Sequence, residues 1–209
     1  MIEKIFSGKY LKRLDNITRW LDKDVVKRES VTKHSYDVSV FCTLVLDEIF
    51  RGIKNEDLFT DFKLHCIQCA IYHDWDEALL LCDMSHETKY NEFNGDEIRD
   101  SLNDLSKELT KREFLTKEGN VVFDSMTNKD PAVKAVVKFC DWLSMLFFLV
   151  REQSLGNNTL EPQRLHCVDS INSAFITMCM ELEKKFSWSF NYSNIRLFVY
   201  DLTNQYGKR

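Results

Sequence analysis

Glycine and proline are scarce in this chain of 209 residues, which has only six glycines and two prolines. Both residue types interrupt regular structure, so their scarcity predicts long uninterrupted helices. No segment shows the sustained alternation of apolar and polar residues, joined by hairpin turns, that indicates β-strands. The sequence therefore predicts an all-α fold, and its 44% hydrophobic content suits a single domain covering residues 1–209.

Long apolar runs and runs of positive charge are also missing. The most apolar window, residues 142–150, lies between Asp141 and Arg151 and is too short to span a bilayer. No run of five or more lysines and arginines occurs, and the net charge is −5. This balance argues against an extended nucleic-acid surface, but not against a small phosphate pocket. We expect a protein that spans no membrane and binds no long nucleic acid.

The beginning of the chain lacks the pattern of a signal peptide, because residues 1–20 mix charged residues with apolar ones throughout. Seven cysteines, an odd number, are scattered through apolar segments. Buried reduced thiols in a cytoplasmic protein are the expected interpretation. His65, Cys66 and Cys69 superficially resemble a zinc site, but the Cys-x-x-Cys spacing lacks a second ligand pair, so we expect structural thiols.

The apolar spacing predicts a succession of helices. Ser30 or Thr32 can cap a helix that covers residues 34–50. Pro131 suits the first turn of a helix over 130–158, and Gly156 with Asn157 suits its end. The tail, residues 194–206, fits a helix or a strand. The other expected helices cover residues 1–20, 58–81, a surface segment that ends near Gly119, and 162–185.

Ionisable residues interrupt the apolar segments at three points. His73 and Asp74 stand together in "CAIYHDWDEALLL", His34 opens an earlier helix, and Asp141 lies within "VVKFCDWLSMLFFLV". Each taken alone is more commonly a core residue bonded to backbone, because an unpaired buried charge costs several kcal/mol. A divalent cation ligated by all four would satisfy them at once. Two imidazoles and two carboxylates suit zinc, manganese, iron or cobalt, and the ligand types do not choose among them.

The order His, His-Asp, Asp resembles the HD-domain phosphohydrolase superfamily, and in particular its bacterial 5'-deoxynucleotidase (YfbR-like) group. Three blocks carry the resemblance over about residues 10–160: "ITRWLDKDVVKRESVTKHSYDVSV", "YHDWDEALLLCD" and "VVKFCDWLSMLFFLVREQSLGNN". They are similar to the group's Arg-Trp followed by Asn-Val-x-Glu-His-Ser, to its Tyr-His-Asp-x-x-Glu, and to its Lys-x-x-Asp helix ending in Gly-Asn-Asn. The resemblance implies a helical bundle with a metal site in its core.

The resemblance also implies roles for individual residues. Glu77 would be the general acid/base, acting with the ligand Asp74; without the resemblance, a solvated acid at a helix end is an equal alternative. Arg19 would contact the phosphate, and Trp20 would pack beside the sugar and disfavour a 2'-hydroxyl. An arginine lying over a core indole is the alternative for this pair. The metal ligands would be His34, His73, Asp74 and Asp141, the metal Co, Mn, Zn, Fe or Mg, and the partner of the 3'-hydroxyl Asp83.

Three departures from the group put substrate choice in doubt. Lys33 stands where the group has a glutamate before the first histidine, and with Lys89 it could supply positive charge to the substrate. "CDMSHETK" replaces the group's Gly-Asp-Leu-Pro-Thr-Pro, which places His86 beside the pocket. One extra residue separates Glu77 from Asp83, so the role of Asp83 is less secure. His166 is expected to be structural.

The leading hypothesis is a metal-dependent 5'-deoxynucleotidase, which converts a deoxyribonucleoside 5'-monophosphate and water to deoxynucleoside and phosphate. The first alternative is a triphosphohydrolase that releases triphosphate from a deoxynucleoside triphosphate. The second is a non-catalytic nucleotide-binding domain, against which the complete ligand set and Glu77 argue. A phosphodiesterase has no supporting motif beyond the shared ligands. The resemblance favours a homodimer or higher homo-oligomer, which the spacing of residues does not test.

Overall fold

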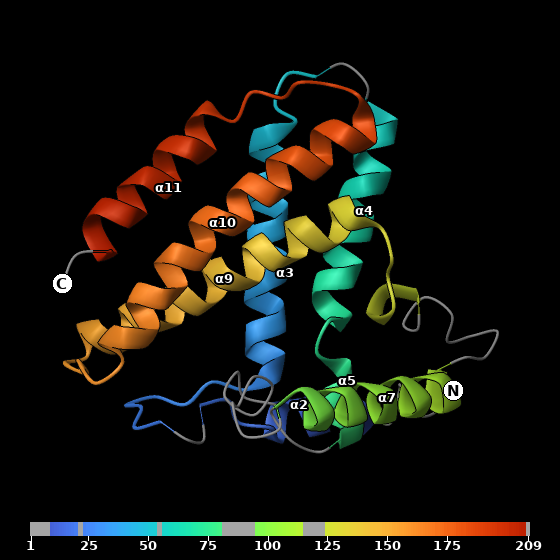
Figure 1. Ribbon diagram of the computed structural model, residues 1–209, viewed down its shortest axis with the longest axis vertical. Helices are drawn as coiled ribbons and strands as arrows, with labels where there is room; N and C mark the ends of the chain where they lie inside the picture. The colour runs from blue at the N-terminus through green and yellow to red at the C-terminus, as the bar shows by residue number, and fades with distance from the viewer. Residues whose placement is uncertain (1–8, 21–22, 54–55, 81–94, 115–123, 208–209) are drawn as a thin grey trace. The chain divides into compact units, whose positions relative to one another are not determined.

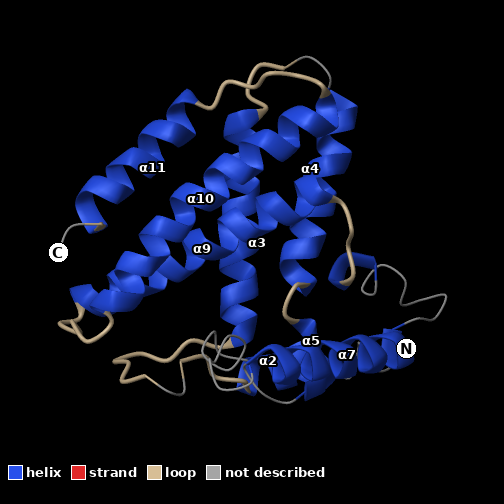
Figure 2. Ribbon diagram, in the orientation of Figure 1, coloured by secondary structure: helices blue, strands red, loops and turns tan. Residues whose placement is uncertain are grey.

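The computed structural model describes residues 9–20, 23–53, 56–80, 95–114 and 124–207. In this part of the chain the regular structure is helical, as predicted, apart from one isolated bridge between Thr18 and Ser30 (Figures 1 and 2). The helices are α2 (Lys9–Asn16), α3 (Val31–Ile49), α4 (Glu56–Tyr72), α5 (Trp75–Leu80), α7 (Gly95–Phe114), α9 (Pro131–Ser154), α10 (Glu161–Phe186) and α11 (Ser193–Tyr206).

Two compact units make up the chain. The first contains residues 1–24, 28–35 and 72–127, and the second contains 25–27, 36–71 and 128–209. In the first unit, α5 contacts both α2 and α7. Its core is formed by Tyr10, Leu14, Ile17, Val31, Trp75 and Ala78. Because Val31 begins α3 and Trp75 begins α5, the apolar core fixes the two chain segments that carry His34 and His73.

The second unit is organised around α9 and α10, which run side by side, with α11 packed against α10 (Figure 1). At the start of α9 the Asp130 side chain accepts hydrogen bonds from the amides of Ala132 and Val133, and Pro131 occupies the first turn. After the helix ends, Gly156 adopts a left-handed φ of 92°. The predicted positions of Pro131 in the first turn of α9 and of Gly156 after its end are thus confirmed. A cluster of phenylalanine rings fills another part of this unit: Phe50, Phe59, Phe62, Phe186 and Phe190.

Two helices differ from the predicted boundaries. The first ends at Asn16, because Thr18 pairs with Ser30 and the backbone is extended there. The segment 58–81 is divided into α4 and α5 by a turn at His73 and Asp74. The tail, which the sequence left open between helix and strand, is the helix α11. None of the described helices is long and apolar enough to cross a membrane.

Candidate metal centre

The turn between α4 and α5 carries two ionisable side chains, those of His73 and Asp74. The backbone carbonyl of Asp74 accepts a hydrogen bond from the amide of Glu77 at 3.1 Å, which starts α5. His73 and Asp74 therefore belong to neither helix. Their side chains are 18% and 20% exposed, so both lie partly inside the protein.

His34 lies next to this turn, within the same unit. Its Nε2 is 3.8 Å from Asp74 Oδ2, and the Nε2 of His73 is 3.0 Å from the same oxygen. The two imidazole rings have their centroids 5.3 Å apart. His34 is 1% exposed, and the helix α3 that begins at Val31 holds it in position. Two imidazoles and a carboxylate therefore converge on one point.

The distances suit a shared cation. Two donor atoms bound at right angles, each about 2.1 Å from one ion, lie about 3 Å apart. The His73 nitrogen is 3.0 Å from the Asp74 oxygen and so has this spacing, whereas the His34 nitrogen, at 3.8 Å, requires a wider angle at the ion. Imidazole and carboxylate donors together favour a first-row divalent cation over calcium. The donor set of the turn therefore fits a transition-metal ion.

Glu77 is the buried acid of this site. It lies in the first turn of α5 and is 3% exposed, although a solvated acid at a helix end was an equal alternative from the sequence. Asp74 and Glu77 are three residues apart, a spacing at which helical side chains lie near each other. Glu77 is therefore an enclosed carboxylate one helical turn from Asp74 in the chain, and an enclosed carboxylate is one of the groups that can transfer a proton.

Arg19 and Trp20 lie in the loop of residues 18–30, closed at its base by the bridge between Thr18 and Ser30. The Arg19 amide donates to the Glu29 carbonyl at 2.9 Å, and its guanidinium Nη1 lies 3.3 Å from Glu29 Oε2. Trp20 has a positive φ of 64°, which is strained for a bulky residue. A bulky residue keeps such a backbone conformation only where surrounding contacts offset its free-energy cost. Glu29, whose side chain is 3% exposed, was not among the predicted site residues.

Three further residues were predicted to contact the substrate: Lys33, Asp83 and Lys89. Lys33 is exposed in the first turn of α3, directly before His34, and its amide donates to Ser30 Oγ at 3.2 Å. This hydrogen bond confirms Ser30 as the cap of α3. Asp83 and Lys89 lie outside the described residues, as does His86. Their predicted roles therefore stay predictions.

Asp141 belongs to the second unit and is described there by itself. It lies in the middle of α9, with its side chain 19% exposed. Its Oδ2 is 2.8 Å from the Nζ of Lys138, one turn earlier, and Lys138 also lies over the ring of Trp142. Lys138, on the same helix, therefore supplies part of the positive charge that a partly buried Asp141 needs.

The cysteines behave as structural thiols. No disulfide joins any of them within the described residues, and Cys42, Cys66, Cys69, Cys140 and Cys167 are buried. Burial raises the pKa of the Cys66 thiol far above its ordinary value. Because a zinc ligand must be a thiolate, this environment supports the interpretation of Cys66 as a core residue.

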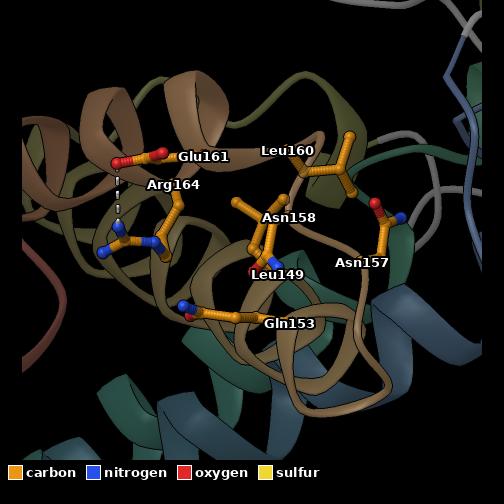
Figure 3. A pocket seen from close by; sticks show the side chains of 7 residues that line it. All are labelled: Leu149, Gln153, Asn157, Asn158, Leu160, Glu161 and Arg164. Atoms are coloured by element: carbon orange, nitrogen blue, oxygen red, sulfur yellow. Dashed lines mark ion pairs between the residues drawn. The ribbon is translucent and has the colours of Figure 1, made fainter. Parts of the chain in front are cut away.

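A separate pocket of about 240 Å³ lies in the second unit, where α9 ends and α10 begins (Figure 3). Asn157 and Asn158 line it, as does the ion pair between Arg164 and Glu161, with a distance of 3.8 Å. The described residues around this pocket include none of the predicted site residues. This pocket therefore lies apart in the chain from the residues that the sequence predicts as the site.

Comparison with known proteins agrees with this geometry. The family model for 5'-deoxynucleotidase YfbR-like proteins matches residues 7–192. The chain belongs to this family. A crystal structure of an HD-domain phosphohydrolase from Listeria innocua is similar, with a TM-score of 0.60, 18% identity, and coverage of 84% of this chain and 79% of that one. No match was found among curated proteins.

A second similar structure is the PH0347 protein from Pyrococcus horikoshii, with a TM-score of 0.60 and 24% identity. It is matched over 96% of its length by 90% of this chain. At these identities the two structures establish the fold, which is that of the HD domain. Membership of the YfbR-like family makes the protein a metal-dependent hydrolase of phosphoric esters.

Proposed function

We propose that this YfbR-like protein is a 5'-deoxynucleotidase, which converts deoxyribonucleoside 5'-monophosphates to deoxynucleosides and orthophosphate. The convergence of His34, His73 and Asp74 beside buried Glu77 is the observation that carries the proposal. A nucleotide-binding domain without activity would not need an enclosed acid next to a set of metal ligands. The matching family supports the choice of substrate.

Asp141 is the fourth metal ligand in this proposal. Four protein donors, two imidazole nitrogens and two carboxylate oxygens, would then hold one divalent cation, and His34, His73 and Asp141 offer suitable ligand atoms. Its partly buried position on α9 supports a role beyond surface charge, because a partly buried carboxylate costs more free energy than an exposed one. The cation would be Co, Mn, Zn, Fe or Mg.

The reaction transfers a phosphoryl group to water. The bound cation would neutralise charge on the phosphoryl oxygens and lower the pKa of a bound water. Glu77 would move the proton that the attacking water loses toward the 5'-oxygen, whose bond to phosphorus breaks. Arg19 would bind the remaining phosphate oxygens with its planar fork of donors, and Glu29 fixes one edge of that fork.

Discrimination against ribonucleotides would rest on residues around the sugar. Trp20, held at a positive φ of 64°, would pack against the face of the sugar that bears a 2'-hydroxyl in ribonucleotides. Asp83 would accept a hydrogen bond from the 3'-hydroxyl. Because ribose and deoxyribose share the 3'-hydroxyl, Asp83 would orient the sugar, and Trp20 would supply the preference for deoxyribose, at most about 10²-fold for an apolar wall against an added hydroxyl.

A deoxynucleoside triphosphate triphosphohydrolase is the second candidate. Exposed Lys33 beside His34 favours it, since a glutamate at this position would repel a longer phosphate tail. Lys89 would add to this charge. The same metal ligands and Glu77 would serve either reaction, because the same phosphorus–oxygen bond at the 5'-oxygen is broken.

Analysis of the released phosphate separates the two reactions. Purified protein with manganese or cobalt is incubated with deoxynucleoside monophosphates, deoxynucleoside triphosphates and their ribose counterparts. We expect orthophosphate from the deoxy monophosphates, with little from the ribose forms. Intact triphosphate released only from deoxynucleoside triphosphates would transfer the assignment to the second candidate. Absence of turnover across the panel would contradict both.

Two further features are proposed for the whole protein. The family match covers residues 7–192, and so includes most of both compact units, which supports one HD domain over residues 1–209. The resemblance to the family also supports a homodimer or higher homo-oligomer. Deoxynucleotides are the proposed small-molecule partners, in a cytoplasmic setting.

A further inference from the structure

Glu152 is a buried carboxylate that the proposed reaction does not use. It lies in the last turns of α9 and is 0% exposed. A charge in such a position is costly unless several donors surround it. Its Oε2 accepts hydrogen bonds from the Val26 amide at 2.6 Å and from Asn157 Nδ2 at 3.1 Å, and its Oε1 accepts one from the Lys27 amide at 3.0 Å.

Val26 and Lys27 form the middle of the 18–30 loop, which also contains Arg19 and Trp20. Residues 25–27 belong to the second unit, whereas 18–24 and 28–30 belong to the first. The loop is therefore held at two points. Its base is closed by the bridge between Thr18 and Ser30, and its middle is attached to α9 by the Glu152 carboxylate.

Polar contacts, rather than apolar burial, attach the middle of the loop. The Val26 side chain is 61% exposed, and Lys27 is exposed as well. Arg151 adds a weaker contact from its Nη2 to the Lys27 carbonyl at 3.5 Å. Because the two side chains bury little, the two amide hydrogen bonds to Glu152 supply most of what fixes this part of the backbone.

The attachment is close in sequence to the groups that would bind phosphate. Lys27 is followed by Arg28 and then by Glu29, which contacts Arg19 through both its backbone carbonyl and its side chain. Movement of the backbone at 26 and 27 would therefore change where Glu29 holds the Arg19 guanidinium. Displacements of about 1 Å in a positioned group are enough to lower activity strongly.

We propose that Glu152 is a positioning residue for substrate phosphate, acting by holding the 18–30 loop so that Glu29 presents Arg19. The proposal rests on the proposed function, since it takes Arg19 as the phosphate contact. In this proposal Glu152 acts through the loop and not by contact with the substrate. The effect on substrate affinity would pass along the backbone from Lys27 to Glu29.

The test compares Glu152→Gln with Asn157→Ala. The glutamine replaces one accepting oxygen with a donating NH₂ group, so in the present geometry one of the two loop amides would face a donor instead of an acceptor. The alanine removes one donor from the same carboxylate but leaves the Val26 and Lys27 amides bonded. We expect Glu152→Gln to raise KM for a deoxynucleoside monophosphate roughly tenfold, with kcat within about twofold. Asn157→Ala should leave KM near the wild-type value.

Hydrogen exchange gives a second readout that does not depend on turnover. Amides of residues 23–30 should exchange faster in Glu152→Gln than in wild type or Asn157→Ala. Unchanged KM and unchanged exchange in Glu152→Gln would overturn the proposal, and so would an equal rise of KM in both variants. If Glu152→Gln does not fold, Glu152→Asp, which keeps the charge but shortens the reach, is subjected to the same comparison. A wild-type protein without turnover would instead contradict the proposed function, while the exchange rates would still decide whether Glu152 holds the loop.

Discussion

Burial of Glu77 is unusual for a charged residue at the start of a short helix. It is 3% exposed and follows a turn in which two imidazoles and the Asp74 carboxylate converge. A carboxylate whose only role is to make the surface polar would face water, because burial removes its hydration shell and raises its free energy. The side chain is therefore in the environment in which enzymes place groups that transfer protons.

Replacing Glu77 by Gln should remove proton transfer but keep the size of the side chain. We expect kcat for deoxynucleoside monophosphate hydrolysis to fall by about 10²–10⁴. Bound metal per chain, measured by elemental analysis, should not change, because Glu77 is not one of the proposed ligands. Glu161→Gln, at an exposed acid in the first turn of α10, is the matched control. A variant at Glu77 that keeps full kcat would remove it from the mechanism.

At the scale of helices, local chemistry was sufficient to predict most elements. Pro131 and Gly156 mark the ends of α9, and Ser30 caps α3. Within 58–81 the apolar residues lead into a turn at His73, which the structure confirms, but the continuing apolar spacing did not indicate that α5 is a separate helix after this break. Such a break costs helical hydrogen bonds, and it persists here because the turn projects His73 and Asp74 toward His34.

The start of α9 offers a test of helix capping with a defined pH dependence. Burial alone would raise the pKa of Asp130, but hydrogen bonding and attraction to Lys185 outweigh it, together with the amides of Val133 and Ala132, and lower the pKa. These partners exist only in the folded state. Their stabilisation is therefore complete above the pKa of a free aspartate, about 3.9, and is lost as the pH falls through the lower folded value.

Asp130→Ala should reduce the free energy of unfolding by about 0.5–2 kcal/mol at neutral pH. The difference from wild type should shrink below about pH 4, where the wild-type carboxylate also becomes protonated. Urea unfolding at pH 7 and pH 3 measures both values. A difference between the two proteins that is the same at both pH values would show that the charge of Asp130 does not stabilise α9.

At the scale of the whole molecule, two compact units share one helix. Residues 31–35 of α3 belong to the first unit and 36–49 to the second. Unfolding of either unit would expose part of this helix, so we expect the units to unfold together. The core residues Leu14 in the first unit and Leu182 in the second are 1% and 0% exposed.

Leu14→Ala and Leu182→Ala should each lower the free energy of unfolding by about 2–5 kcal/mol. Thermal unfolding followed by calorimetry should give one transition in wild type, which both variants shift as a whole. Two separate transitions, each moved by only one of the variants, would contradict the single domain predicted from the sequence.

The fold class and the turn at His73 could be predicted from the sequence, but the acids that hold the 18–30 loop, Glu29 and Glu152, were not predicted. His34, His73 and Asp74 could be predicted because ionisable residues stand out in apolar segments. Glu29 could not, since it lies in a polar stretch where an acid is unremarkable. Glu152 did carry a signal: it follows Leu149 and Phe148 by three and four positions, and so continues the buried face of α9 with a charge.

The central claim is that the histidines and aspartates of this site bind the cation that hydrolysis needs. The most direct measurement is bound cobalt per chain together with orthophosphate release from a deoxynucleoside monophosphate, in wild type, His73→Ala and His65→Ala. His65 is a half-buried histidine on α4 without a proposed role. We predict that His73→Ala loses both metal and activity, whereas His65→Ala keeps both. Metal binding and turnover that survive in His73→Ala would contradict the account.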